Sequence, residues 1–168
     1  MKKINASYYE FFFFRYAIIV FVIHLVMVPI TLIYKEKDIP LLFCVTIPCC
    51  FFLFLICFSE YRRLKKNIQL AEVKLTDNTL LINNTPYSAG QIDGITSLSV
   101  RDALDKYNLY LVEFKTADCD IYYCLDKPMN WKFESPTIQL LNKHAQFSSK
   151  TKESTVVTNG FQGLKQKK

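Results

Sequence analysis

The sequence has few of the residues on which common catalytic motifs depend. It holds four glycines and two histidines among its 168 residues. It contains no Walker A phosphate loop, no HExxH zinc motif and no GxSxG nucleophile motif. An enzyme would have to build its site from scattered side chains. The sequence therefore predicts a chain that is not an enzyme, with no catalytic residue, no cofactor and no metal site.

Charge is missing from two long stretches near the N-terminus. Tyr16 to Tyr34 and Ile39 to Ser59 contain no Asp, Glu, Lys or Arg. A bilayer-spanning helix needs ~20 mainly apolar residues. The pattern therefore predicts transmembrane helices over 11–34 and 40–60, joined by a short periplasmic link at 35–39. A cleaved signal peptide is the alternative for the first stretch, but no small-residue cleavage site follows it.

Basic residues flank the two apolar stretches. They comprise Lys2, Lys3 and Arg15 before the first stretch, Lys35 and Lys37 in the link, and Arg62, Arg63, Lys65 and Lys66 after the second. Because basic flanks stay on the cytoplasmic side, this distribution predicts a multi-pass protein of a bacterial inner membrane with both termini in the cytoplasm. The four basic residues after the second stretch are also candidate contacts for an anionic membrane surface.

Polar and thiol side chains within the apolar stretches are candidate functional residues. His24 is predicted to be a neutral histidine that makes a polar contact with the second helix. A proton relay is the alternative, although neither stretch supplies an acid as its partner. The thiols in the second stretch are expected to act as small hydrophobes, and they are Cys44, Cys49, Cys50 and Cys57. For Cys57, palmitoylation or metal binding is the alternative.

Alternating apolar and polar residues follow the second stretch. They predict strands at 72–76, 79–83, 95–100, 107–115 and 121–125, separated by turn residues. Ser135 is a suitable N-cap, and Pro136 a suitable first residue, for a helix that reaches Phe147. These elements predict an α+β cytoplasmic domain over 61–147, an antiparallel bent sheet or small sandwich with one C-terminal helix. Residues 1–10 are predicted to be a cytoplasmic N-terminus, and 148–168 a disordered basic tail.

Two stretches carry a resemblance to a known family. They are VKLTDNTLLINNTPYSAGQIDGITSLSV and YNLYLVEFKTADCDIYYCL, followed by the helix after Ser135. Their order, behind a paired helical anchor, resembles bacterial pleckstrin-homology-like domains over roughly 70–147. The resemblance implies a bent sheet or sandwich capped by a helix and used for binding, with no shared enzymatic activity.

The remaining ionisable and thiol residues form no recognisable site in the sequence. Cys119 and Cys124 are five positions apart, which places them on opposite faces of a predicted strand. His144 is expected to be exposed, or to act as a cap, near the C-terminus of the last helix. The loops at Asp102 and Asp118, together with exposed sheet edges, are the expected contact surfaces.

These observations favour a non-catalytic inner-membrane protein whose cytoplasmic domain binds a protein partner. A self-protection role, immunity to a membrane-acting toxin or conjugative entry exclusion, fits this architecture by analogy. The alternatives are a scaffold or regulatory subunit of a membrane complex, a lipid-surface binding module, and an enzyme acting on lipids or thiols. The lipid bilayer and a protein are the expected partners. Nucleic acid is not expected, because charge between Leu70 and Phe147 is roughly balanced, and the sequence leaves the oligomeric state open.

Overall fold

The chain divides into two compact units. The computed structural model describes residues 2–33, 39–101, 109–127, 134–152, 154–161 and 164, and gives the backbone alone at 8, 9, 12–19, 31, 32, 39–43 and 45. The helical unit is Phe12–Leu64, and the sheet unit joins Met1–Phe11 to Lys65–Lys168. The N-terminal residues therefore belong with the C-terminal two thirds of the chain, and the helical unit is an insertion between them.

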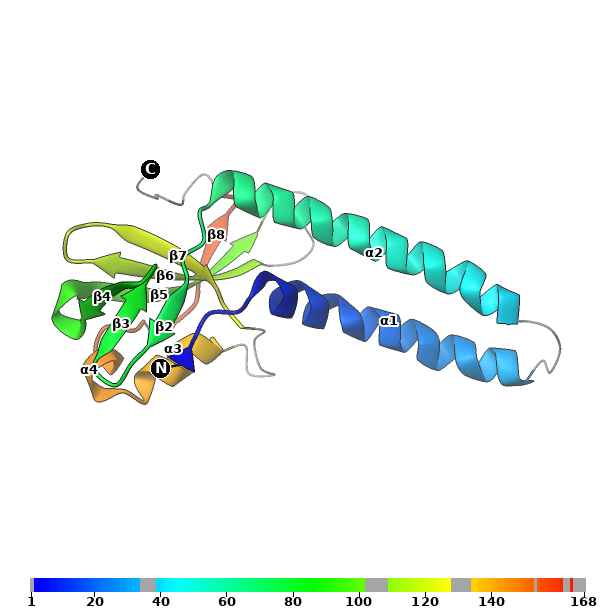
Figure 1. The fold of residues 1–168 in the computed structure, drawn as a ribbon, viewed down its shortest axis with the longest axis horizontal. Coiled ribbons are helices and arrows are strands. Elements are labelled where there is room, and N and C mark those ends of the chain that lie inside the picture. The colour runs from blue at the N-terminus through cyan, green and yellow to red at the C-terminus, as the bar shows by residue number, and fades with distance from the viewer. Residues whose placement is uncertain are drawn as a thin grey trace. The chain divides into compact units, whose positions relative to one another are not determined.

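Two long helices make up most of the helical unit. Helix α1 spans Tyr8–Ile33 and helix α2 spans Ile39–Asn67, and they run antiparallel beside each other (Figure 1). Many large apolar side chains on them are exposed, and the most exposed are Phe21, Leu25, Ile33, Ile47, Phe51, Phe52 and Phe54. Large exposed apolar surfaces mark places that another molecule covers. The predicted link at 35–39 falls almost wholly outside the described residues, because only Ile39, the first residue of α2, is described.

The structure corrects the expected membrane anchor. Within the residues that the structure describes, no helix combines the length and the apolar character needed to cross a membrane. The predicted spans at 11–34 and 40–60, the multi-pass topology, and the inner-membrane localisation with cytoplasmic termini are therefore contradicted.

The first sheet of the sheet unit, sheet A, is antiparallel. Its strand order is β1-β2-β3-β4, with bounds Lys2–Lys3, Val73–Leu75, Thr79–Ile82 and Thr85–Ser88. Asn83 and Asn84 connect β3 to β4 with φ of 50° and 67°. Positive φ at both central residues defines a type I′ hairpin turn, and asparagine tolerates this conformation better than most residues. The predicted strands at 72–76 and 79–83 are confirmed.

The second sheet, sheet B, has the order β7-β6-β5-β8, with antiparallel pairs except for the parallel pair β5 and β8. The bounds are Ile92–Arg101 for β5, Leu109–Thr116 for β6, Ile121–Leu125 for β7 and Val156–Asn159 for β8. Leu111 and Val112, which face opposite sides of β6, are both fully buried. Sheet B is thus covered on both faces, as predicted for the long strand at 107–115.

The core of the sheet unit lies between the two sheets and two short helices. The 3-10 turn η1 (Ala89–Gln91) leads into β5, and the helices are α3 (Pro136–Asn142) and α4 (Ala145–Ser148). The buried cluster joins Leu80 of sheet A and Phe114 of sheet B to Leu141 and Phe147 of the helices. Ser135 caps α3 by accepting a hydrogen bond from the Ile138 N–H at 3.1 Å, as predicted for this N-cap.

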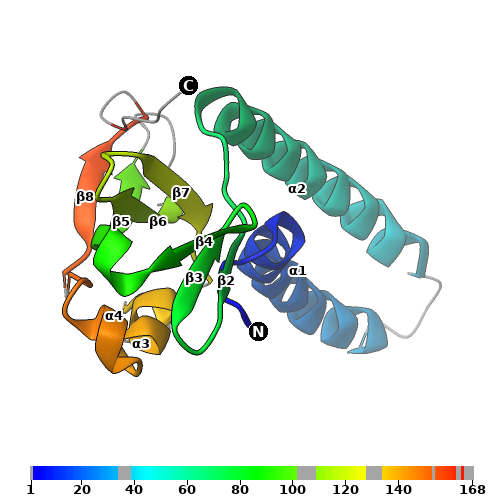
Figure 2. The same cartoon turned by 60° about the vertical axis from the view of Figure 1, so that its left-hand side comes forward.

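The C-terminal part of the chain differs from the expectation in two places. The single helix predicted over 135–147 is divided at Lys143 and His144, and His144 becomes the N-cap residue of α4. The tail 148–168, expected to be disordered, supplies strand β8 at the side of β5 (Figure 2). A lysine-rich composition therefore conceals a short uncharged segment with high β propensity.

Candidate functional site

The titratable and thiol side chains do not converge on a catalytic centre. Cys119 is exposed in the turn between β6 and β7, with φ of 65°, whereas Cys124 is buried in β7. Among the described residues, no three His, Cys, Asp or Glu side chains are grouped so that they could hold a metal ion. Asp118 is exposed in the same turn as Cys119, and Asp102 lies outside the described residues.

His24 makes two hydrogen bonds within the helical unit. Its Nδ1 lies 2.8 Å from the Val20 carbonyl oxygen, and its Nε2 lies 3.3 Å from the Thr46 hydroxyl on α2. A carbonyl oxygen can only accept, so Nδ1 donates to Val20, and the tautomer with its proton on Nδ1 can accept from the Thr46 hydroxyl at Nε2. His24 therefore links α1 to α2.

The four residues predicted to contact an anionic membrane surface lie on the last turns of α2, and they are Arg62, Arg63, Lys65 and Lys66. Arg62, Lys65 and Lys66 are exposed. The Arg62 guanidinium lies over the Phe58 ring, 5.5 Å from its centre, a distance at which a cation is attracted to an aromatic face. Basic side chains at a helix C-terminus also interact favourably with the helix dipole, so the cluster has a structural role at this helix end.

Asp126 is buried where β7, the N-terminus of α3 and the N-terminal segment meet. Its carboxylate accepts hydrogen bonds from the Ser135 hydroxyl and from the backbone N–H groups of Lys127 and Thr137. Thr137 in turn donates from its hydroxyl to the Ile4 carbonyl oxygen at 3.3 Å. Burial raises the pKa of the Asp126 carboxyl, and these donors oppose that effect. Asp126 and Thr137 therefore link β7, α3 and the N-terminal segment, and the hydrogen bonds to Asp126 offset the cost of burying its carboxyl.

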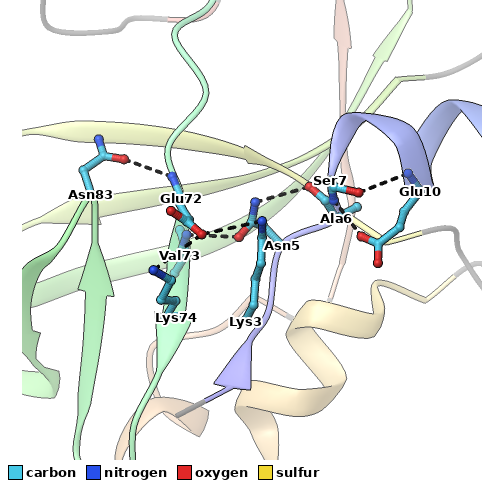
Figure 3. A network of polar contacts seen from close by, with 9 residues as sticks. All are labelled: Lys3, Asn5, Ala6, Ser7, Glu10, Glu72, Val73, Lys74 and Asn83. Atoms are coloured by element: carbon cyan, nitrogen blue, oxygen red, sulfur yellow. Dashed lines mark hydrogen bonds and ion pairs between the residues drawn. The ribbon is translucent and has the colours of Figure 1, made fainter.

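The N-terminal segment is held in the sheet unit by a polar network (Figure 3). Glu72 pairs with both Lys3 and Lys74 at 3.5 Å, and its backbone N–H donates to the Asn83 side chain. At the start of α1, the Ser7 hydroxyl accepts from the Glu10 N–H and the Glu10 carboxylate accepts from the Ser7 N–H. This reciprocal pair is a capping box, and it fixes the point at which the chain leaves the sheet unit.

The edges of the two sheets are the surfaces on which a binding function can be built. An unprotected edge strand offers unpaired N–H and C=O groups to another chain, and natural proteins usually block such edges. Each described edge can therefore be tested for the devices that block strand addition: short length, lysine, proline, or a covering segment.

Both edges of sheet A are blocked. Strand β1 consists of two exposed lysines, and short edges that carry lysine resist pairing. Strand β4 contains Pro86. Because Ile82 and Thr85 are the pair that closes the two-residue turn, the nitrogen of Pro86 points away from β3, and proline removes a donor from the outer edge.

The β7 edge of sheet B is covered by two other segments. Leu70 forms a parallel bridge with Tyr123, and the Ala71 N–H donates to the Tyr123 carbonyl at 2.7 Å. The Ala6 N–H donates to the Leu125 carbonyl at 3.0 Å. Further along β7, the Tyr122 and Tyr87 hydroxyls lie 3.0 Å apart and join sheet B to sheet A.

Strand β8 is short, like β4, but its edge has no lysine, no proline and no covering segment among the described residues. The stretch 154–161 contains neither proline nor a charged residue. Val156 is 40% exposed and Val157 is 53% exposed. The Gly160 N–H donates to the Arg101 carbonyl on β5. Because backbone groups alternate in direction along a strand, the Thr158 N–H also points toward β5, and the Val157 N–H points away from it. The β8 edge is thus the one described edge that is open to strand addition.

Sequence analysis expected exposed sheet edges to be contact surfaces but did not identify this one. The run TVVTN has the β-branched composition of a strand, and that signal was available. The surrounding lysines and the short length concealed it. Comparison of the chain with protein families, characterised proteins and solved structures gave no match, so the site's chemistry is argued from this structure alone.

Proposed function

We propose that this chain is a non-catalytic protein-binding module that holds an extended segment of a partner protein at the β8 side of sheet B. The observation that supports the proposal is the contrast between the edges. Three of the four described edges are blunted or covered, whereas β8 exposes valines and outward backbone groups. In strand addition, main-chain hydrogen bonds supply affinity and alternate side chains supply specificity.

Self-protection and scaffolding both remain proposals for the process that this binding serves. A small non-catalytic module acts in either process by occupying a partner's segment. A partner that is a toxin or a conjugation component favours self-protection, and a partner from a resident complex favours scaffolding. The identity of the captured protein therefore decides between the two.

A matched pair of substitutions tests the proposed edge. Lysine at an edge position disfavours strand pairing, so V157K is expected to abolish capture of the partner from the native host after crosslinking when the partner adds outside β8. T85K places the same side chain on the exposed first residue of β4 and serves as the control. Equal recovery of one specific partner with both variants would rule out the β8 edge as the binding surface.

A further inference from the structure

The C-terminal tail is held against β5 mainly by backbone hydrogen bonds. The Ile95 N–H donates to the Lys150 carbonyl at 2.8 Å, and the Lys152 N–H donates to the Ile95 carbonyl at 2.9 Å. Further along, Leu98 to Arg101 pair in parallel with Val156 to Asn159. The outer edge of β5 is therefore an edge that pairs with a further strand, and the chain's own tail is that strand (Figure 2).

The side chains of the tail match those of β5 unevenly. The Thr155 hydroxyl donates to the Ser97 hydroxyl at 3.3 Å. Two residues further along, on the same face of β5, Ser99 pairs with Val157. Ser99 is 4% exposed, and among the described residues its hydroxyl has no hydrogen-bond partner. The row of paired hydroxyls that begins with Ser97 and Thr155 thus stops at Val157, which cannot bond to Ser99.

A buried hydroxyl without a partner is costly, and native structures satisfy the great majority of such groups. The Thr158 hydroxyl on β8 is likewise buried without a partner in the described part of the chain. The tail therefore occupies β5 with two polar mismatches, while Val157 as a whole residue stays more than half exposed. A different strand could bond to β5 equally well through its backbone and better through its side chains.

We propose that the outer edge of β5 is itself the binding edge for a partner segment and that β8 is a replaceable internal strand. The ligand is an extended, uncharged segment of a partner protein that lies parallel to β5 and places a hydroxyl or amide side chain opposite Ser99. The inference rests on the proposed binding of a partner segment at the β8 side of sheet B, and it adds which strand the partner contacts, in which direction, and with which side chain. Because V157K changes only the strand that is displaced, displacement predicts that V157K keeps capture of the partner, whereas addition outside β8 predicts that V157K loses it. It also makes β8 a competitor that the partner displaces.

Two synthetic peptides test the inference on the full chain. One has the native sequence of residues 154–160 and the other carries V157T in that sequence. Because the threonine hydroxyl can bond to Ser99, the V157T peptide is expected to bind roughly fivefold more tightly, the factor that one net hydrogen bond supplies. On binding, β8 amides should lose protection from hydrogen exchange while β5 amides keep theirs. Equal affinity of the two peptides, or undiminished β8 protection, would overturn displacement.

Two variants of the chain provide a matched control. T158P removes an N–H that faces β5, so it should release β8 and strengthen peptide binding. V157P removes an outward N–H and should leave peptide binding nearly unchanged. The opposite pattern, with binding lost in V157P and unchanged in T158P, would show that the peptide adds outside β8. Displacement would then be wrong while the proposed function stands.

A third variant guards against misfolding of the proline variants. V157T in the full chain bonds the internal strand to Ser99, so it should raise the protection of β8 and weaken binding of both peptides by roughly fivefold. Unchanged β8 protection in V157T would contradict the role assigned to Ser99. If neither peptide binds any variant, including T158P in which β5 is open, the inference is overturned. The capture experiment with V157K would still test the proposed function.

Discussion

The Asn5 side chain accepts a hydrogen bond from the backbone N–H of Val73 at 3.1 Å, across 68 positions of sequence. The Ile4 N–H donates to the Val73 carbonyl at 3.1 Å, and the Asn5 amide donates to the Ala6 carbonyl at 3.2 Å. These bonds attach the residues that precede the helical unit to strand β2 of sheet A (Figure 3). The sheet unit is therefore discontinuous in sequence, and its N-terminal residues are part of its structure.

The first prediction concerns Asn5. Because Asn5 is buried and satisfies the Val73 N–H, N5A leaves that donor unpaired and should lower the free energy of unfolding by about 1–3 kcal/mol. Urea unfolding measures the change. K2A removes an exposed side chain of β1 and is the control, with an expected change within about 0.5 kcal/mol. Equal stability of N5A and K2A would show that the N-terminal segment contributes no structure.

The second prediction concerns Asn84, whose φ of 67° is costly for a β-branched residue. N84V should lower the free energy of unfolding by about 1–2 kcal/mol. N84G should leave it nearly unchanged, because glycine adopts positive φ without a steric cost. Chemical denaturation of the two variants measures the difference. A tolerated valine would contradict the type I′ turn between β3 and β4.

The strands and turns of the sheet unit could be predicted because their signals are local. Alternating residues and the Asn83–Asn84 turn specify β2, β3 and β4 without reference to distant residues. The joining of Lys2 and Lys3 to β2 could not be predicted, because it depends on pairing across the whole helical unit. The two transmembrane helices predicted from the apolar stretches were wrong, because apolar composition alone does not specify what covers an apolar surface.

The candidate site was harder to predict for a related reason. An edge is open or blocked according to which strand lies beside it, and sequence analysis had no strand order for the two sheets. Pro86 blocks an edge only because β4 is the last strand of sheet A. Ser99 matters only because Val157 lies opposite it. Both facts come from long-range pairing.

The third prediction concerns the pH dependence that Asp126 confers. Burial raises the pKa of its carboxyl in the folded protein above the ordinary value of 3.8. The folded state therefore binds the proton more tightly than the unfolded state does. The contribution of Asp126 to the free energy of unfolding is therefore largest below pH 3.8, and it is lost as the pH rises through the pKa of the folded protein. The free energy of unfolding of D126N should lack this pH-dependent part when it is measured from below pH 3.8 to above the pKa of Asp126 in the folded protein.

A companion variant separates charge from hydrogen bonding at Asp126. The asparagine of D126N keeps an oxygen for the Lys127 and Thr137 N–H groups, whereas D126A leaves the donors without their acceptor. D126A should therefore lower the free energy of unfolding by about 2 kcal/mol more than D126N. A pH dependence that persists in D126N would assign it to another group.

The fourth prediction concerns the tyrosine pair that joins the sheets. The hydrogen bond with Tyr122, aided by partial burial and nearby acids, raises the pKa of Tyr87 to about 12. Y122F removes the hydrogen bond, so the pKa of Tyr87 should fall toward the ordinary value of 10.0. Ultraviolet titration of phenolate absorbance measures it, with Y87F used to assign the signal. An unchanged titration in Y122F would contradict the link.

The account depends most on the β8 side of sheet B as the place where a partner binds. A photo-crosslinking amino acid at position 157, introduced in the native host, tests this directly, with position 85 on β4 as the matched comparison. The account predicts that position 157 crosslinks one specific protein and that position 85 does not. Crosslinking of the same protein at position 85 alone would contradict it.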